Sequence, residues 1–179
     1  MMKVSAYVGT SMDGFLARKN GDFGWLEVFA NEEANRAYES FILGIDAIVI
    51  GRMTFEAVLK FPVWPYQKEV YVLSNTLREI FDKPSEKISI LSMKPKDLLV
   101  FLRQRGFENI YVDGGQVIQQ FLKENLLDEI IISTAPVLIG SGIPLFAGIE
   151  KDISFTLIRS EIQSNGLVRN HYVKKADTN

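Results

Sequence analysis

The segment Asn109–Leu122, NIYVDGGQVIQQFL, constrains the fold of this chain more than any other. A short β-rich run, Ile110–Val112, meets Asp113 and the pair Gly114-Gly115, and apolar residues at helical spacing follow. Strand, glycine pair and helix in this order are typical of α/β proteins that bring bare backbone N–H groups up to an anionic ligand. The same glycines would also suit a tight strand-to-helix turn without a ligand, so the segment alone leaves both interpretations open.

The other segments of the chain alternate in the same way. Apolar, β-rich runs predict further strands at Lys3–Gly9, Ala47–Gly51, Glu69–Ser74, Lys87–Leu91, Glu129–Ile139, Ile153–Ser160 and Gly166–Val173. Apolar residues at helical spacing follow Asn31, Gly51 and Pro95. This alternation predicts a mostly parallel sheet with flanking helices, and the last two runs predict an antiparallel hairpin. Pro136 predicts an edge or a bulge in the long run that contains it.

A chain of 179 residues is long enough to bury a substantial core. We expect one α/β domain over residues 1–175 and a disordered tail over residues 176–179. The net charge of −2 argues against a general nucleic-acid binder, which would carry a basic excess. The absence of cysteine excludes disulfides and fits a reducing compartment, and no segment resembles a secretory signal or a bilayer-spanning helix. These features predict a cytoplasmic protein.

Several common chemistries lack the residues that they need. His171 is the single histidine, so a Ser-His-Asp arrangement would depend entirely on it, and no G-x-S-x-G motif is present. No His/Asp/Glu cluster has the spacing of metal ligands, so no metal site is predicted. The phosphate-binding motif G-x-x-x-x-G-K-[ST] does not occur, and Gly114-Gly115 lacks the third glycine of the dinucleotide-binding motif.

Three polar turns remain, and each follows a predicted strand: Gly51–Thr54, Ser74–Thr76 and Gly114–Gln116. Parallel strands place their carboxyl ends along one edge of the sheet, where α/β proteins bind ligands. Two of these turns open helices, which can offer N–H groups to phosphate, and Arg52 adds a forked cation. The turn Ser74–Thr76 offers hydroxyl and amide groups in place of a carboxylate, which leaves room for a 2′-phosphate and favours NADP(H).

The order and spacing of these motifs resemble the dihydrofolate reductase-like group. Within it, the chain is most similar to the C-terminal reductase domain of bifunctional riboflavin-biosynthesis deaminase/reductases and to small stand-alone bacterial proteins of that kind. The resemblance covers nearly the whole chain and rests on Val4–Ala17 with Ser11-x-Asp13-Gly14, Ile50–Glu56, Val72–Asn75, Val112–Leu122 and Leu138–Phe146. It implies a three-layer α/β fold with a mostly parallel central sheet, antiparallel C-terminal strands and flanking helices.

The resemblance also implies NADPH, bound in an extended groove. The positions implied to hold its phosphates are Gly51, Arg52, Thr54, Ser74, Asn75, Thr76, Gly114, Gly115, Gln116 and Val117. Among these, Arg52 would lie near the 2′-phosphate. The backbone of Gly9 and the side chains of Leu16 and Ala17 would lie beside the nicotinamide, and Trp25 would close over it. The implied reaction is hydride transfer to a C=N or C=O bond of a small heterocyclic substrate of the pteridine or pyrimidine type.

Acidic residues near the implied nicotinamide site have competing interpretations. The acid that anchors the pterin in folate reductases would fall in the window Ala30–Asn35. This window contains Glu32, whose simpler role is favourable charge in a first helical turn. Asp13 is the best-placed acid near the nicotinamide, although Asp-Gly is also a routine turn. The catalytic candidates are therefore Asp13, Trp25 and Glu32.

Phe15 departs from the family pattern, because the riboflavin reductases have a basic residue after Ser-x-Asp-Gly. This difference argues against a phosphorylated riboflavin precursor as substrate. Three hypotheses stay open: an NADPH-dependent reductase of another small substrate, the 5-amino-6-(5-phosphoribosylamino)uracil reductase of riboflavin biosynthesis, and an NADP(H)-binding module without turnover. The resemblance and the apolar C-terminal strands predict a homodimer, with a small-molecule substrate and no nucleic-acid or membrane partner.

Overall fold

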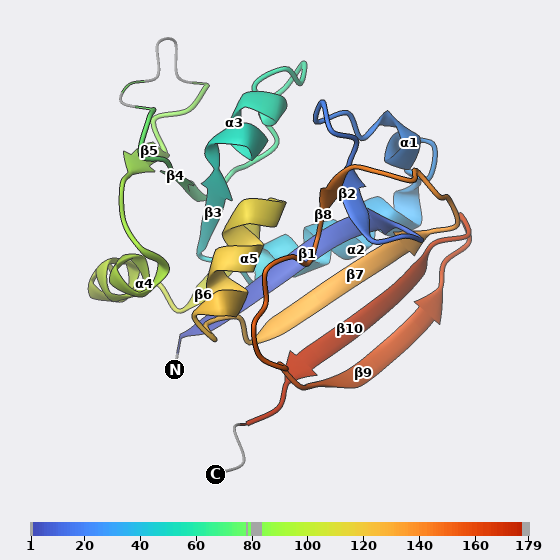
Figure 1. Cartoon of the computed structure of the whole chain (residues 1–179). Coiled ribbons are helices and arrows are strands. Elements are labelled where there is room, and N and C mark those ends of the chain that lie inside the picture. Colours follow the sequence, from blue (N-terminus) through green and yellow to red (C-terminus); the bar gives the residue numbers. More distant parts are fainter. Residues whose placement is uncertain (1, 78, 80–83, 177–179) are drawn as a thin grey trace.

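The computed structural model of this protein describes residues 2–77, 79 and 84–176 (Figure 1). The strands of its main sheet are β1 (Lys3–Ser11), β3 (Ala47–Gly51), β4 (Glu69–Leu73), β5 (Ile88–Leu91), β6 (Asn109–Asp113), β7 (Glu129–Ala135), β9 (Phe155–Ile162) and β10 (Val168–Lys174). A separate two-stranded ribbon pairs β2 (Phe15–Ala17) with β8 (Ile143–Pro144). The helices are α1 (Gly24–Glu27), α2 (Glu32–Leu43), α3 (Arg52–Val58), α4 (Pro95–Gln104) and α5 (Gly115–Lys123).

Within the described residues, the strands form one eight-stranded sheet in the order β5-β4-β3-β6-β1-β7-β10-β9. Every pairing from β5 to β7 is parallel, whereas β10 runs antiparallel to both β7 and β9. The predicted mostly parallel sheet with an antiparallel C-terminal hairpin is therefore confirmed. The strand ends before the three polar turns belong to β4, β3 and β6, which are neighbours in the sheet, so these turns share one edge as predicted.

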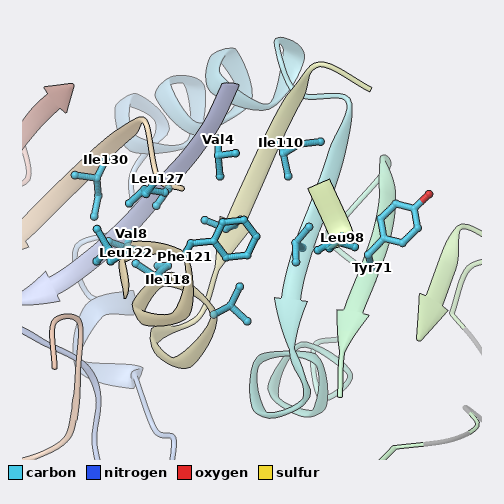
Figure 2. Close-up of a cluster of buried hydrophobic side chains, with 14 of the residues drawn as sticks. Val4, Val8, Tyr71, Leu98, Ile110, Ile118, Phe121, Leu122, Leu127 and Ile130 are labelled. Atoms are coloured by element: carbon cyan, nitrogen blue, oxygen red, sulfur yellow. The ribbon is translucent and has the colours of Figure 1, made fainter. Parts of the chain in front are cut away.

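Helices cover both faces of the sheet and make a three-layer structure. On one face, Phe121 of α5 and Leu98 of α4 pack on alternate residues of the parallel strands, such as Val4 (Figure 2). On the opposite face, Phe55 of α3 and aromatic residues of α2 pack around Tyr111. Burial of each large apolar side chain contributes about 1.5–3 kcal/mol, so these two layers stabilise the sheet that carries the polar turns.

Asn31 begins α2 as predicted, since its side-chain oxygen accepts a hydrogen bond from the backbone N–H of Ala34 at 2.8 Å. Strand β1 is longer than predicted, because Thr10 and Ser11 continue the ladder with β7 in place of forming a turn. Both residues are buried. The turn is confined to the residues that follow, and it leads directly into the short strand β2.

The prediction that Pro136 marks an edge strand or a bulge is wrong. Strand β7 lies inside the sheet, between β1 and β10, and it ends at Ala135. Because proline has no N–H to donate to the ladder, Pro136 ends the strand. Two short elements, α1 and β8, were not predicted, and the C-terminal hairpin begins two residues later and ends one residue later than expected. Of the predicted disordered tail, residues 177–179 lie outside the described residues.

Candidate active site

A cavity of about 440 Å³ opens at the carboxyl ends of β1, β3 and β6. Nine of the residues predicted to contact a cofactor line it: Gly9, Leu16, Ala17, Gly51, Thr54, Gly114, Gly115, Gln116 and Val117. The sheet explains why they meet, because parallel neighbouring strands deliver their following turns to the same edge. Their roles stay predictions, but the structure brings these residues to one place.

Two of the polar turns pack directly against each other in the cavity wall. Gly114 has a φ of +90°, and a Cβ placed on it would lie 2.2 Å from Oγ1 of Thr54. A side chain at position 114 is therefore excluded twice, by the backbone conformation and by the neighbouring helix α3. Gly51 lies similarly close to Val117, with 3.2 Å between its ideal Cβ and a methyl group of that side chain. The missing side chains of both glycines therefore let the two turns pack closely in the cavity wall.

Arg52 and the turn after β4 form a polar cluster next to this cavity. The Nη1 of Arg52 donates to Oγ1 of Thr76 at 3.3 Å, and its Nε lies 3.5 Å from the carboxylate of Glu56. The hydroxyl of Ser74 lies 3.4 Å from that of Thr76 and accepts from the backbone N–H of Leu77. The structure thus brings the predicted cation and the two predicted hydroxyls together at the exposed surface.

Asn75, also predicted to bind the cofactor, lies in the same turn. Its side-chain oxygen accepts a hydrogen bond from Oγ of Ser92 at 2.7 Å. This contact ties the turn after β4 to the segment that follows β5. Asn75 therefore supports the shape of the turn in this structure, and its amide nitrogen is the group left to face a ligand.

Asp113 is a cavity residue that the sequence analysis did not name as a candidate. It is the last residue of β6, and the cavity wall around it contains Tyr7, Tyr38, Tyr66 and Tyr111. The Oδ1 atom accepts from the backbone N–H of Gly114 at 2.7 Å, and Oδ2 lies 3.5 Å from the hydroxyl of Tyr66. In the sequence, the signal that could have identified Asp113 is the position of an acid directly before the glycine pair.

Removal from bulk water raises the pKa of Asp113 above its ordinary value, against the opposing hydrogen bonds from Gly114, Tyr111 and Tyr66. The same burial, together with the charge of this carboxylate, raises the pKa values of Tyr66 and Tyr111. Desolvation is the dominant cause in each case. A carboxyl group that holds its proton more strongly than usual, inside a ligand-sized cavity, can act as a proton donor.

Asp13 lies outside the cavity lining and accepts hydrogen bonds from a neighbouring loop. Its two carboxylate oxygens accept from the backbone N–H groups of Ile139 and Gly140 at 3.3 and 2.7 Å. Its pKa is lowered, chiefly by a hydrogen bond from the side chain of Ser11 and also by these two amides. Asp13 thus fastens the loop after β7 to the β1–β2 turn, and its lowered pKa favours the ionised form, which has no proton to donate.

The other two catalytic candidates also lie outside the cavity lining. Glu32 is exposed in the first turn of α2 and forms an i,i+4 ion pair with Arg36 at 2.8 Å, so the structure favours its simpler interpretation. Trp25 does not line the cavity, whereas the next residue, Leu26, does. The short helix α1 accounts for this difference, because successive residues of a helix point about 100° apart.

Apolar side chains form another part of the cavity wall. A methyl group of Leu26 would lie 2.4 Å from a Cβ on Gly9, so the missing side chain of Gly9 makes room for α1. Phe23 and Phe61, from the segments after β2 and after α3, pack edge to face with ring centroids 6.0 Å apart. Both rings line the cavity. A bound ring system would therefore be screened from water on this side.

Among residues 2–77, 79 and 84–176, no group of three His, Asp or Glu side chains is arranged to hold a metal ion. Over the same residues, no helix has the length and apolar character needed to cross a membrane.

The strand order and the antiparallel C-terminal hairpin define a dihydrofolate reductase-like fold. More specifically, the sequence model of the RibD C-terminal domain matches residues 2–169, and the chain belongs to this family of reductase domains. The predicted family and the predicted fold are therefore confirmed.

Individual relatives are similar over nearly their whole length. The uncharacterized protein YwjB of Bacillus subtilis is 33% identical over 175 residues, which are 96% of this chain and 98% of YwjB. A solved structure from Shewanella sp. PV-4, whose name refers to riboflavin biosynthesis, is 37% identical with a TM-score of 0.92 over 98% of this chain and 100% of that one. A pyrimidine reductase-like protein from Corynebacterium diphtheriae, 19% identical with a TM-score of 0.77 over 98% and 93% of the two chains, shares the fold.

Proposed function

We propose that this protein is an NADPH-dependent reductase of a small heterocyclic substrate with a C=N or C=O bond. The observation that carries the proposal is Asp113, a carboxyl group of raised pKa that faces a cavity beside two glycine turns. Reduction of such a bond needs a hydride and a proton. The turns suit a cofactor that carries phosphates, and Asp113 suits the proton.

The residues present fit NADPH as a ligand. Gly114 and Gly115 line the cavity at the start of α5, so backbone without side chains borders the space where a pyrophosphate would approach. Arg52, Ser74 and Thr76 already form one hydrogen-bonded cluster of a cation and two hydroxyls, which suits a 2′-phosphate. When bound, NADPH supplies the hydride.

The protein's own residues would hold the substrate and move a proton. The tyrosine rings around Asp113 offer a flat, apolar wall for a heterocycle, and they keep water away from the carboxyl group. Asp113 would donate its proton from Oδ2 to the heteroatom of the bond being reduced, while the N–H of Gly114 holds Oδ1 in place. Positioning of the ring and retention of the proton are thus the two tasks of this wall.

The test begins with cofactor binding. NADPH is titrated into the protein, and energy transfer from tryptophan to the nicotinamide ring is followed. Absence of binding at millimolar NADPH would overturn the proposal. If NADPH binds, its oxidation at 340 nm is measured with dihydrofolate, pteridines, quinones and aminopyrimidines. Turnover with one of these classes supports a reductase, whereas binding without turnover of any class supports the alternative of a binding module.

Aminopyrimidines belong in the panel because of the family and of the name of the Shewanella protein. The riboflavin precursor 5-amino-6-(5-phosphoribosylamino)uracil is the specific second candidate. Phe15, which occupies the position of a basic residue in the riboflavin reductases, lies in β2 and is half-buried. Comparison of a phosphorylated aminopyrimidine with its unphosphorylated counterpart tests this point, because the loss of a cation predicts no preference for the phosphate.

We also propose that the protein forms a homodimer through the outer face of β9 and β10. Figure 1 shows no helix in front of these strands, and Leu157 and Ile162 are 51% and 85% exposed. Leu157 pairs with Tyr172, so these side chains share one face of the sheet. Leu157→Glu should shift the protein to a monomer in light scattering, whereas Leu43→Glu, at an exposed position of α2, should leave the dimer intact. A wild-type protein that is monomeric at all concentrations would overturn this proposal.

A further inference from the structure

A second cavity of about 370 Å³ lies between α2 and the C-terminal strands. It is on the face of the sheet opposite to Leu157, because its strand residues alternate with those of the outer face. Tyr7 lines both this cavity and the first cavity, around Asp113, which the proposed function makes the reductase cavity. The apolar part of its lining comes from Ile131 and Phe41, and the rest is rich in charge.

Cations outnumber carboxylates in this second cavity. Its permanent cations are Lys3, Arg159 and Arg169, its carboxylates are Glu129 and Glu161, and His171 is a further basic group. The Oε2 atom of Glu129 lies 2.6 Å from Nζ of Lys3 and 2.9 Å from Nε2 of His171. Glu161 holds both arginines. Without His171, three permanent cations face two carboxylates, so this lining carries one excess positive charge.

Donors remain after these pairs are formed. The ammonium of Lys3 has three N–H groups, and the guanidinium of Arg159 has five. In this structure, Nζ of Lys3 pairs with Glu129 and Nη2 of Arg159 pairs with Glu161. The side chain of Arg159 is also 68% exposed, so its fork can turn toward a ligand. Guanidinium and ammonium groups around an apolar floor suit a small organic anion, and a phosphate group matches the fork best.

Arg169 connects this charge to the reductase cavity. Its Nη2 pairs with Glu161 at 2.9 Å, and its Nη1 donates to the hydroxyl of Tyr7 at 3.4 Å. The backbone carbonyl of Tyr7 in turn accepts from the hydroxyl of Tyr111 at 3.0 Å. An anion that draws Arg169 away from Tyr7 would therefore change contacts in the wall that holds Asp113.

We propose that the second cavity is an effector site for a small phosphate-bearing anion, and that its occupancy alters the reductase cavity through Tyr7. The binding part of this inference is independent of the reductase activity. The predicted phosphate cluster at Arg52 lies at the other cavity, so inorganic phosphate could bind at both places. The experiment must therefore separate the two.

Calorimetry with inorganic phosphate, on the intact protein at constant ionic strength, provides the separation. The Arg52→Gln variant removes the cation of the cofactor cluster and should still bind phosphate. Arg159→Gln should weaken this remaining binding about tenfold or more, because a charge-assisted contact is lost, and Arg159→Lys should restore part of it. Arg103→Gln, at an exposed position of α4, is the matched control and should bind like the parent.

Phenyl phosphate and glycerol 2-phosphate then distinguish a free phosphate from a phosphomonoester. Tighter binding of phenyl phosphate than of inorganic phosphate is expected, since Phe41 and Ile131 can contact its ring. For the effector role, phosphate should shift the tyrosine-dominated near-ultraviolet circular dichroism of Arg52→Gln but not that of its Tyr7→Phe double variant.

Two results would overturn the inference. One is equal affinity for phosphate in Arg52→Gln and in the double variant Arg52→Gln/Arg159→Gln. The same conclusion would follow if chloride, at equal ionic strength, gave the same binding signal as phosphate. The other is binding with no change around Tyr7. A failure of NADPH to bind would overturn the proposed function and leave this experiment untouched, because Arg52→Gln is tested without cofactor.

Discussion

Thr54 occupies the space that a side chain on Gly114 would need, with Oγ1 2.2 Å from the ideal Cβ position. The contact joins the first turn of α3 to the turn before α5, and both turns line the reductase cavity. The bare backbone at position 114 is thus fixed by its neighbour as well as by its own dihedral angles.

Gly114→Ala should therefore destabilise the fold and abolish tight NADPH binding. A residue with a side chain at a φ of +90° costs about 1–3 kcal/mol, and the displacement of Thr54 adds to that cost. Gly106→Ala is the matched control, because Gly106 has a φ of +83° but nothing within 4 Å of its ideal Cβ. Thermal unfolding and NADPH titration of the two variants separate the backbone cost from the contact. Equal losses in both would contradict the role of Thr54.

Arg52→Gln should weaken NADPH much more than NADH. A charge-assisted hydrogen bond to phosphate contributes about 1.5–3 kcal/mol, so the expected loss for NADPH is about 10-fold to 150-fold, with a small change for NADH. The affinities are measured by tryptophan fluorescence. Arg36→Gln removes an exposed arginine that pairs with Glu32 and should change neither affinity. A similar loss for both cofactors would mean that Arg52 does not contact the 2′-phosphate.

Asp113→Asn should lower kcat/KM by about 100-fold to 10,000-fold, the usual contribution of a positioned acid. The cofactor affinity should change little, because an asparagine oxygen can still accept from Gly114. Glu32→Gln, an exposed position paired with Arg36, should retain full activity. If the loss of activity appeared in Glu32→Gln and not in Asp113→Asn, the folate reductase-like interpretation of Glu32 in α2 would be correct.

The raised pKa of Asp113 also predicts a pH dependence of stability. Between the ordinary value of 3.8 and the raised pKa, the folded protein binds more protons at this group than the unfolded chain does. The free energy of unfolding therefore falls as pH rises through this window. Relative to wild type, Asp113→Asn should gain stability as the pH rises, and the two should converge at low pH. Thermal unfolding from pH 3 to 8 measures the difference; parallel curves would contradict it.

Asp13→Asn should act on the loop after β7 and not on the chemistry. The carboxylate accepts from the backbone N–H groups of Ile139 and Gly140, so a neutral side chain should loosen that segment. Hydrogen exchange at these two amides should become faster, with the pH profile of turnover unchanged. A shifted pH profile would restore Asp13 as a catalytic acid.

The polar turns could be located from the sequence because their signals are local. Glycine and short polar residues mark where β3, β4 and β6 end, and the alternation of strands and helices orders those ends along one edge. The ends of the strands are set by their pairing partners and not by local signals. Thr10 and Ser11 resemble turn residues in the sequence, but both pair with β7 in the structure.

The wall around Asp113 could not be predicted in this way. Its tyrosines come from β1, α2, the segment before β4, and β6, and no local pattern links them. Their effect on Asp113 is a consequence of burial, which depends on the assembled fold. Similarly, Leu26 and not Trp25 lines the cavity because the four-residue helix α1, which was not predicted, sets the direction of both side chains.

Asp113 and Gly114 are consecutive residues, and this has a consequence for engineering. The acid and the start of the anion-binding turn cannot be moved apart by any change that keeps the backbone of β6 intact. Tyr38 and Tyr66 come from other segments, so their positions around Asp113 depend on how α2 and the segment before β4 pack on the sheet. In the proposed reductase, the proton donor and the start of the cofactor-binding turn are therefore joined by a single peptide bond.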